Sequence, residues 1–479
     1  MTTAGPAPTA YWCETLLVGG VAVAGVRLTV GADGRIRSRE DDVLPEPGDL
    51  RLGTVLPGFG NAHSHAFHRA LRGRTHADGG DFWQWRQSMY AAAHSLDPVL
   101  YRRLATAVFA EMLVSGYTAV GEFHYLHHQP DGTPYPQAHA MELALASAAQ
   151  EVGIRLVLLD TSYLAGGIHR SLLPEQAGFG DGSAAGWLAR WWALRETLAT
   201  EAAARPGNPA LVTLGAALHS VRAVPVEAMR EILAGLPAGV PLHIHLSEQP
   251  RENADCVAAY GSTPTEVLAG LGALSPRLSA VHGTHLSDTD LQLLGANGVT
   301  VVMCPSTEAD LGDGIGPARA LADAGAPIAL GSDQNAVVDP FLELRGLEMG
   351  ERLASLQRGR FSPAALLQAA TTNGYASLGL TGGSLVPGAP ADLVEVDRQS
   401  LRTVGAAVEQ LVLAATAADV RRVIVAGRLV ADTGRLVGTP ATTLAAAATA
   451  PSALPSSAEG SPAVLLRDAL AALDAAAAS

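Results

Sequence analysis

The sequence predicts an α/β fold: a (β/α)8 barrel of the TIM type with a small β-sandwich domain formed from the N- and C-terminal flanks. From Gly53 to about Gly382, short apolar runs alternate with longer segments of helical periodicity, the pattern of repeated βα units around a parallel sheet. Most runs lead directly into polar side chains, as expected when a site is built at the C-terminal ends of barrel strands. Short strands with glycine-containing turns at both ends of the chain predict the flanking domain.

Eight apolar runs provide the predicted barrel strands. They are residues 54–62, 118–123, 154–160, 211–218, 241–246, 278–281, 299–304 and 327–330. The polar residues at or just after their ends are His63 and His65, Glu122 and His124, Asp160, His219, His245 and Glu248, His282, Ser306, and Asp333. Because the strands of a parallel barrel end at the same mouth, these side chains are expected to meet there.

The domain boundaries follow from the same patterns. The barrel is expected over residues 57–384, between a first part of the β-sandwich at residues 1–56 and a second part at residues 385–436. Residues 437–479 form an Ala-rich tail whose last stretch has helical spacing, so we expect a peripheral C-terminal helix there. Two long connections, residues 66–95 and 161–186, are candidates for substrate-covering loops.

The composition limits the partners that the protein can bind. With a formal net charge of −14 and no basic cluster, the chain is not expected to bind nucleic acid or an anionic membrane. An anionic small-molecule substrate would need local arginines. The three cysteines, Cys13, Cys256 and Cys304, are far apart, which argues against disulfides and a thiolate zinc site. No apolar run approaches the ~20 residues of a membrane span, and we expect a cytoplasmic homodimer.

The sequence contains no lysine, so all 32 residues of the lysine and arginine class are arginine. This absence excludes a Schiff-base lysine, a phosphate-loop lysine and a carbamylated lysine that bridges two metal ions. A metal site in this chain is therefore expected to hold one ion.

Three segments supply a candidate metal site. In PGFGNAHSHAF, His63 and His65 stand two residues apart at a strand end, so both imidazoles can face one cation. PLHIHLSEQ adds His245, and LGSDQN adds Asp333. Three histidines and an aspartate suit zinc or another borderline divalent ion, with water in an open position. His243 is in phase with His245 and could also be a ligand, but it lies one layer deeper in the barrel, so His245 is preferred.

Two further residues are candidates for proton transfer, together with Asp333. Glu248 follows His245 by three residues, where its carboxylate can reach the site without ligating the metal. His282, in VHGTH, can orient the attacking water or stabilise charge on the adduct. His285 is the competing choice, and His282 is preferred because it directly follows its strand.

Four side chains are candidates for substrate binding. They are Arg86 in FWQWRQSMY, Tyr125 in GEFHYLHH, and His219 with Arg222 in LHSVRAV. Arginine binds carboxylates through paired hydrogen bonds, so Arg86 and Arg222 suit an anionic substrate. Taken singly, each of these residues is also compatible with an ordinary surface or helix-packing role.

These motifs resemble the amidohydrolase superfamily, in particular its mononuclear deaminases, which lack the bridging lysine. PGFGNAHSHAFHRAL, FWQWRQSMY, GEFHYLHH, LHSVRAV, CPSTEADLGDGIGPA and GSDQNAVVDP, within about residues 11–435, are similar to the formimidoylglutamate deiminases of histidine degradation. The resemblance implies metal ligation by His63, His65, His245 and Asp333, acid/base work by Glu248 and His282, and carboxylate binding around Arg86, Tyr125 and Arg222.

The chain departs from this family at three positions near the expected site. His68 stands where family members usually have glutamine, and Gln334 and Asn335 stand where Ser-His is common. His68 follows His63 by five residues, close enough to contact the reacting group, and is a further candidate for substrate binding. These departures affect the choice of N-substituent on the substrate. They put the scaffold less in question.

The resemblance implies hydrolysis of N-formimino-L-glutamate to N-formyl-L-glutamate and ammonia, with one divalent metal ion as cofactor, zinc being the expected metal. Two alternatives stay open. One is a related deaminase that acts on another amidine or a heterocycle. The other is a non-catalytic barrel that keeps a metal for structure or sensing; it predicts loss of the proton-transfer residues, whereas Glu248 and His282 are both present.

Overall fold

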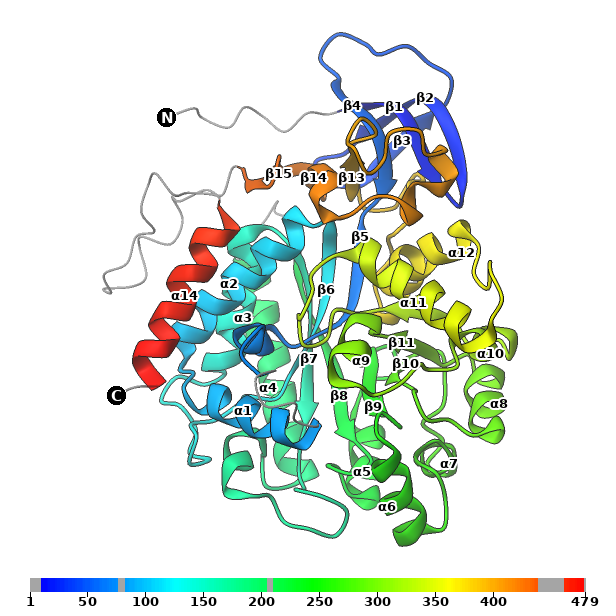
Figure 1. Ribbon diagram of the computed structural model, residues 1–479. Coiled ribbons are helices and arrows are strands. Elements are labelled where there is room, and N and C mark those ends of the chain that lie inside the picture. The colour runs from blue at the N-terminus through cyan, green and yellow to red at the C-terminus, as the bar shows by residue number, and fades with distance from the viewer. Residues whose placement is uncertain (1–9, 76–81, 205–209, 438–460, 478–479) are drawn as a thin grey trace.

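The structure, a computed structural model, describes residues 10–75, 82–204, 210–437 and 461–477 (Figure 1). These residues form two eight-stranded sheets. One is parallel, with its strands in chain order and helices outside, which confirms the predicted barrel. Its strands are β5 (Phe59–Ser64), β6 (Tyr117–His124), β7 (Arg155–Ser162), β8 (Val212–Ser220), β9 (Leu242–Leu246), β10 (Leu278–His282), β11 (Thr300–Met303) and β12 (Ile328–Leu330).

The barrel closes between its first and last strands, next to the expected site. The backbone N–H groups of Ser332 and Asp333 both donate to the carbonyl of His63. The N–H of His65 donates in turn to the carbonyl of Asp333. Gly331 permits this approach, because a Cβ atom there would lie 2.8 Å from both Cβ and the carbonyl oxygen of His63. The closure therefore brings Asp333 beside the two histidines of the first strand.

The predicted first strand, residues 54–62, covers parts of two strands in different sheets. β4 (Leu50–Pro57) belongs to the flanking sheet and β5 to the barrel, with only Gly58 between them. The end of β4 and all of β5 are buried, so the two strands form one apolar run in the sequence. The barrel strands start beside the flanking sheet, and their C-terminal ends point away from it (Figure 1).

The two flanks meet in the second sheet, because β4 from the N-terminal flank pairs with β13 from the C-terminal flank. The other strands of this sheet are β1 (Ala10–Val18), β2 (Val21–Val30), β3 (Ile36–Glu40), β13 (Leu393–Val396), β14 (Val420–Val425), β15 (Arg428–Asp432) and β16 (Arg435–Leu436). All eight strands form one continuous sheet in the order β16-β15-β14-β13-β4-β1-β2-β3. The sheet has an apolar core of its own, which includes Tyr11, Leu28 and Leu393.

Helices surround the barrel, and short helices lie in its connecting loops. They are α1 (Phe82–His94), α2 (Pro98–Val114), α3 (Ala140–Val152), α4 (Ala184–Ala203), α5 (Val226–Gly235), α6 (Pro250–Tyr260), α7 (Pro264–Gly270), α8 (Asp288–Ala296), α9 (Pro305–Leu311), α10 (Ala318–Asp323), α11 (Pro340–Ser355), α12 (Pro363–Gln368), α13 (Gly374–Ser377) and α14 (Pro462–Ala477), with 3-10 helices η1 (Ala66–Leu71), η2 (Pro174–Phe179), η4 (Val408–Leu413) and η5 (Ala417–Asp419) and the π-helix η3 (Ala369–Asn373). Among the described residues, no helix has the length and apolar character needed to cross a membrane.

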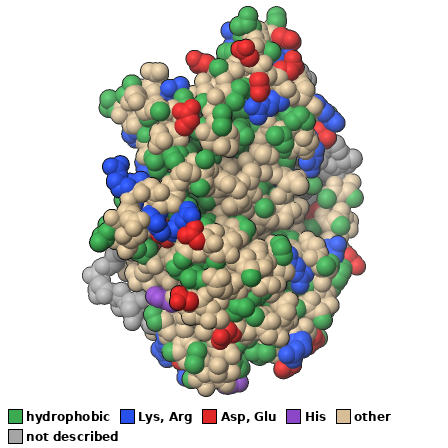
Figure 2. Space-filling model, turned by 90° about the vertical axis from the view of Figure 1, so that its right-hand side faces the viewer, with side chains coloured by type: hydrophobic (Ala, Val, Ile, Leu, Met, Phe, Trp, Pro, Cys, Tyr) green, Lys and Arg blue, Asp and Glu red, His purple; other side chains and the backbone are tan. Residues whose placement is uncertain are grey.

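The predicted covering loops and tail contain regular structure. The first connection holds η1 and α1, and the second holds η2 and the start of α4. α14 lies along α2 on the outside of the barrel, where Asp474 pairs with Arg74 (Figure 1). Parts of the predicted flank, first loop and tail, at residues 1–9, 76–81, 438–460 and 478–479, lie outside the described residues. Figure 2 shows basic and acidic side chains interspersed over the face that carries α8, α10 and α12.

Candidate active site

Four side chains converge at the barrel mouth, where the sequence predicts a metal site. Nε2 of His245 lies 3.1 Å from Nε2 of His63 and 3.3 Å from Nε2 of His65. Oδ1 of Asp333 lies 3.4 Å from Nε2 of His63 and 3.5 Å from Nε2 of His65. Around one tetrahedral ion with bonds of about 2.0–2.1 Å, ligand atoms are separated by roughly 3.3 Å. The spacing of these four buried groups therefore fits a single divalent ion.

The outer ring nitrogens support the same interpretation. Nδ1 of His65 is 2.8 Å from the carbonyl oxygen of Phe123, and Nδ1 of His245 is 2.9 Å from that of His219. A carbonyl can only accept, so Nδ1 carries the proton in each ring and the lone pair of Nε2 faces the shared centre. Burial lowers the pKa of His63, His65 and His245, which keeps these lone pairs available. Several lone pairs that face one another at such distances need a cation between them.

Backbone strain clusters at the same mouth. Ser247, His282 and Asp333 have φ angles of 51°, 71° and 41°, in the left-handed region that residues other than glycine rarely adopt. They follow or end β9, β10 and β12. Strain of this kind persists where the surrounding structure holds it in place, and it is concentrated at functional sites.

The structure separates the two pairs of competing histidines. Nε2 of His243 lies 2.9 Å from the carbonyl oxygen of Ser377, below the mouth, so His245 and not His243 lies with the other candidate ligands. Nε2 of His285 lies 2.9 Å from the carbonyl oxygen of Asp313. His282, in contrast, lies against the predicted ligand Asp333.

His282 connects the candidate metal ligands to a group of carboxylates. Its Nε2 lies 3.8 Å from Oε1 of Glu248 and 3.8 Å from Oδ2 of Asp333. Its Nδ1 lies 3.5 Å from Oε1 of Glu308. Burial disfavours the charged imidazole, but these carboxylates raise the pKa of His282 to about 10. Burial also raises the pKa of Glu248. Glu248 and His282, the residues predicted to transfer protons, thus lie directly beside the candidate metal ligands.

Three carboxyl groups near this pair were not among the predicted site residues. Glu308 accepts the N–H of Cys304 and contacts His282. Burial raises the pKa of Glu252 to about 7 and the pKa of Asp313 to about 8. Glu308 and Asp313 lie within STEADLGDG, so the motif gave a signal for two of them, whereas nothing in the sequence singled out Glu252.

Arg86 and Arg222, far apart in the sequence, lie near the same two groups. Burial raises the pKa of Glu248, and Arg222 and Arg86 both counteract this shift. Burial lowers the pKa of His219, and the same two arginines lower it further. Arg86 also donates to the hydroxyl of Tyr163 at 2.9 Å. The charges of Arg86 and Arg222 therefore both reach Glu248 and His219.

The two predicted covering loops meet above these arginines. Nε2 of Gln176 donates to the hydroxyls of Tyr90 at 2.8 Å and Tyr163 at 2.9 Å. The ring of Phe179 packs on Tyr125 and Tyr163, with centroids 5.1 and 5.5 Å apart. We call Tyr90, Tyr125, Tyr163, Gln176 and Phe179 the roof. The sequence singled out only Tyr125 of this set, because the other four depend on the path of the loops.

The departures from the family differ in their surroundings. Nε2 of His68 lies 3.1 Å from the hydroxyl of Tyr125, and its ring centroid is 4.5 Å from that of His65. Burial lowers the pKa of His68 to about 3, so this ring is neutral. Gln334 donates to a carboxylate on α9, and Asn335 donates to the carbonyl of His65. His68 is therefore the departure that lies directly against the candidate site.

The sequence matches the amidohydrolase family over residues 54–430, which include the whole barrel. The chain belongs to the amidohydrolase family. Members of this family typically bind a divalent metal ion, and the chain brings candidate ligands together at the expected place. The protein is a hydrolase that acts on carbon–nitrogen bonds.

Relatives of known name cover most of the chain. A formimidoylglutamate deiminase of Pseudomonas aeruginosa is 36% identical over 86% of this chain and 92% of its own length. A 5-methylthioadenosine/S-adenosylhomocysteine deaminase of Halobacterium salinarum is 29% identical over 87% of this chain and 92% of its own. Among solved structures, an amidohydrolase of Brucella melitensis superposes with a TM-score of 0.85 at 30% identity, covering 97% of this chain and 99% of that one. A zinc-bound adenosine deaminase of Xanthomonas campestris shares the fold, with a TM-score of 0.79 at 24% identity and full coverage of both chains.

Proposed function

We propose that the protein hydrolyses N-formimino-L-glutamate to N-formyl-L-glutamate and ammonia. The observation that carries this proposal is a pair of arginines at the site: Arg86 is buried and donates to Tyr163 at 2.9 Å, and the charges of Arg86 and Arg222 both reach Glu248 and His219. Two permanent positive charges beside an acid/base pair suit a substrate that carries two carboxylates. The 36% identical deiminase of Pseudomonas aeruginosa supports the same substrate.

His63, His65, His245 and Asp333 would hold one divalent ion, for which we propose zinc. Three imidazole nitrogens and one carboxylate oxygen are a donor set that zinc favours, and the chain has no lysine to bridge a second ion. When bound, the ion lowers the pKa of water toward ~7, so a nucleophile is available at neutral pH.

The side chains around this position supply the remaining steps. Asp333 accepts the proton of the attacking water, and His282, whose Nε2 is 3.8 Å from Asp333, steers it and stabilises charge on the adduct. Glu248, whose pKa is raised by burial, delivers a proton to the nitrogen that leaves as ammonia. Arg86 and Arg222 hold the carboxylates, and the roof shields the reacting carbon from bulk water.

The first test is an ammonia-release assay of the purified, metal-analysed protein with three substrates. We expect N-formimino-L-glutamate to exceed N-formimino-glycine by about 10- to 100-fold in kcat/KM, because one charged hydrogen bond contributes about 1.5–3 kcal/mol. 5-Methylthioadenosine, a neutral heterocycle, should not be turned over. Deamination of 5-methylthioadenosine without turnover of N-formimino-L-glutamate would contradict the proposal and leave a heterocycle deaminase.

The second test replaces Arg222 by Met. This variant should lose the preference for the glutamyl substrate, because kcat/KM for N-formimino-L-glutamate falls about 10- to 100-fold while N-formimino-glycine is little affected. Arg230→Met is the matched control, since Arg230 pairs with Glu227 on the exposed surface of α5. An equal loss on both substrates would show that Arg222 supports the fold and does not bind a carboxylate.

A third variant, His68→Gln, restores the residue that is usual in the family. If His68 is a tolerated substitute at the substrate amidine, the variant should hydrolyse N-formimino-L-glutamate as well as the wild type or better. A large loss of activity on N-formimino-L-glutamate, with gain on no other amidine, would show that His68 itself is required.

A further inference from the structure

A second buried group of histidines and carboxylates lies between the ends of barrel strands β6 and β7 and the helices α3 and α4, and it includes none of the proposed metal ligands. It centres on Arg190 of α4, which makes five hydrogen bonds to three carboxylates. Nε donates to Asp181 at 2.7 Å, Nη1 to Asp160 at 2.7 Å and to Glu142 at 2.9 Å, and Nη2 to Asp160 at 2.9 Å and to Asp181 at 3.1 Å. All five N–H donors of a guanidinium are thereby used, so the group is held in one orientation.

His127 adds a second cation to this group. Its Nδ1 lies 2.8 Å from Oε1 of Glu142, and its Nε2 lies 2.9 Å from the carbonyl oxygen of Thr161. Burial opposes ionisation of Glu142, but hydrogen bonds from His124 and His127 and the charge of Arg190 hold its pKa well below the usual range. Both partners of His127 are therefore acceptors, and each of its nitrogens must carry a proton. We call Arg190, His127, Glu142, Asp160 and Asp181 the Arg190 cluster.

The cluster is tied to the C-terminal end of η2 and to the residues that follow it. The backbone N–H groups of His127 and His128 both donate to the carbonyl of Gly178, at 3.1 and 3.0 Å. Nε2 of His128 lies 3.1 Å from Oδ1 of Asp181. Gly178 is required at this contact, because a Cβ atom would lie only 2.9 Å from the carbonyl oxygen of Gln129. The segment 178–181 is thus held against the end of β6 by backbone and charge together.

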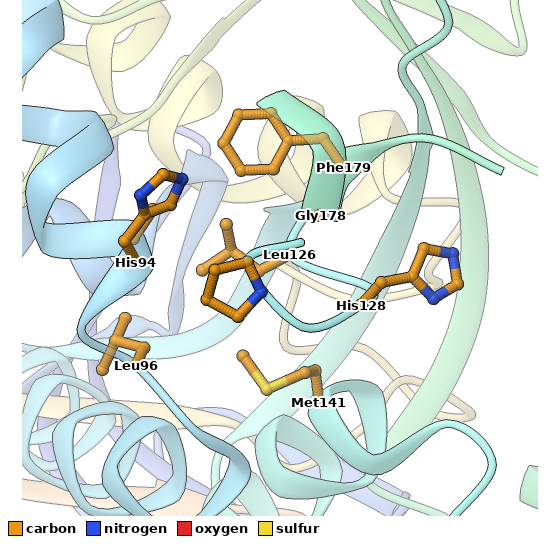
Figure 3. Close-up of a pocket in the computed structure, with 9 residues that line it drawn as sticks. His94, Leu96, Leu126, His128, Met141, Gly178 and Phe179 are labelled. Carbon is orange, nitrogen blue, oxygen red and sulfur yellow. The ribbon is translucent and has the colours of Figure 1, made fainter. Parts of the chain in front are cut away.

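Segment 178–181 includes Phe179, which is part of the roof. Figure 3 shows Phe179 and Gly178 on the far side of a small pocket from Met141, with Leu126 and His128 nearby. Phe179 packs on Tyr125 and Tyr163, and Gln176 of η2 bonds Tyr163, the hydroxyl that also accepts from Arg86. A continuous set of contacts therefore runs from the Arg190 cluster through η2 to a proposed carboxylate-binding arginine.

We propose that the Arg190 cluster positions the roof, and through it Arg86, for substrate binding. Its members are positioning residues, since they contact the roof segment and not the reacting groups. Loosening the cluster should weaken binding more than it slows the chemical step, because Glu248 and His282 lie on strand ends that the segment 178–181 does not hold. The effect on KM rests on the proposed function, whereas the effect on the roof does not.

The test uses Asp181→Asn, which removes one charge from the cluster and keeps its shape. Arg195→Met is the control, because Arg195 lies on α4, as Arg190 does, and is exposed over the ring of Trp192. The chain has no lysine, so trypsin cuts only after arginine, and the exposed Arg170 lies in the connection just before η2. Asp181→Asn should speed cleavage after Arg170 about 10-fold or more, as expected for loss of a charged buried hydrogen bond. Arg195→Met should leave this rate unchanged.

The kinetic arm measures KM and kcat for N-formimino-L-glutamate. Asp181→Asn should raise KM about 10-fold and leave kcat within about twofold, whereas a general loss of structure would lower the active fraction and leave KM unchanged. His128→Gln, which weakens the same carboxylate from outside the cluster, should shift both readouts in the same direction by less. It keeps the test decisive if Asp181→Asn does not fold.

Three results would overturn the proposal. An unchanged rate of cleavage after Arg170 in both Asp181→Asn and His128→Gln would show that the cluster does not hold the roof. Faster cleavage with an unchanged KM would show that the roof does not position the substrate. Two metal equivalents in the wild type and one in His127→Gln would identify His124, His127 and Glu142 as a metal site, since they lie close enough to bind one ion. If the wild type does not hydrolyse N-formimino-L-glutamate, the proposed function is wrong, and faster cleavage after Arg170 still supports the positioning of the roof.

Discussion

The candidate metal ligands and the Arg190 cluster both bury histidines against carboxylates, and they differ in which way the protons point. At the mouth, His65 and His245 donate outward to backbone carbonyls, so the lone pair of His65 faces Asp333 and that of His245 faces Nε2 of His63 and of His65. In the Arg190 cluster, N–H groups of Arg190 and His127 face the carboxylates. The first group needs a cation from outside, whereas the second contains its own cations.

The difference teaches that residue composition and distance do not by themselves identify a metal site. The Nε2–H of His127 donates to the carbonyl of Thr161. The proposed ligands His65 and His245 also donate one ring N–H to a backbone carbonyl. The distinguishing feature is Arg190, whose guanidinium donates to the same oxygen of Glu142 that His127 and His124 approach. A buried arginine among carboxylates therefore indicates an ion-pair network.

The largest expected contrast is in metal content. His245→Gln should lose the bound ion and with it all detectable deaminase activity, because one of four ligands is removed. His127→Gln should keep about one equivalent per chain, the content expected of the wild type. Elemental analysis of the purified proteins measures both. Full metal content in His245→Gln, or loss of metal in His127→Gln, would reverse the assignment of the two groups.

The second contrast concerns two buried glutamates. Glu248→Gln should keep the metal and the fold and lower kcat by roughly 10²–10⁴-fold, since proton transfer supplies that much. Glu142→Gln should leave kcat within a few-fold and lower the free energy of unfolding, because Arg190 and His127 lose part of their compensation. Steady-state kinetics with an unfolding curve separates the two. Near-normal kcat in Glu248→Gln would show that Glu248 is only a loop residue.

The sequence predicted the strand-end residues well because a parallel barrel imposes their position. Once eight strands share one direction, His63, His245 and Asp333 must all emerge at the same mouth, whatever the loops do. The choice of His245 over His243 also followed from depth along a strand. The break at Gly58 was not predicted, because two buried strands in different sheets have the same apolar pattern.

The roof and the Arg190 cluster could not be predicted from the sequence, for a different reason. Gln176, Tyr163 and Tyr90 meet only because two connections fold toward each other. Asp160 was recognised as a strand-end residue, but its partner Arg190 lies on a helix with no motif around it. Contacts set by the path of loops and by helix packing leave no local pattern in the chain.

The third contrast compares two arginines of α4. Arg190→Met should lower the free energy of unfolding by about 3–5 kcal/mol, because it leaves three buried carboxylates with reduced compensation. Arg195→Met should change it by less than about 0.5 kcal/mol, since Arg195 is exposed. Denaturant titration of both variants provides the measurement. Equal stability of the two would mean that the Arg190 cluster contributes nothing to folding.

The smallest expected effect is the pH dependence that His127 gives to stability. Charged and titratable groups face His127 from every element around it. The acids are Glu142 from α3, Asp160 from β7 and Asp181 from the turn before α4, and the bases are Arg190 from α4, His124 from β6 and His128 after β6. Burial and Arg190 disfavour the charged ring, but Asp160, Glu142 and Asp181 raise the pKa of His127 above its ordinary value.

A raised pKa in the folded state fixes the sign of this dependence. The stabilisation is complete below the unfolded pKa of ~6.5 and is lost as pH rises through the folded value. The free energy of unfolding of the wild type, relative to His127→Gln, should therefore fall on the alkaline side by an amount on the order of 1 kcal/mol. Denaturant titrations of both proteins from pH 6 to 9 measure the difference, with metal content held constant. A difference that grows with pH would mean that His127 is neutral in the folded protein, and the Arg190 cluster would then resemble the candidate metal ligands more closely than its hydrogen bonds indicate.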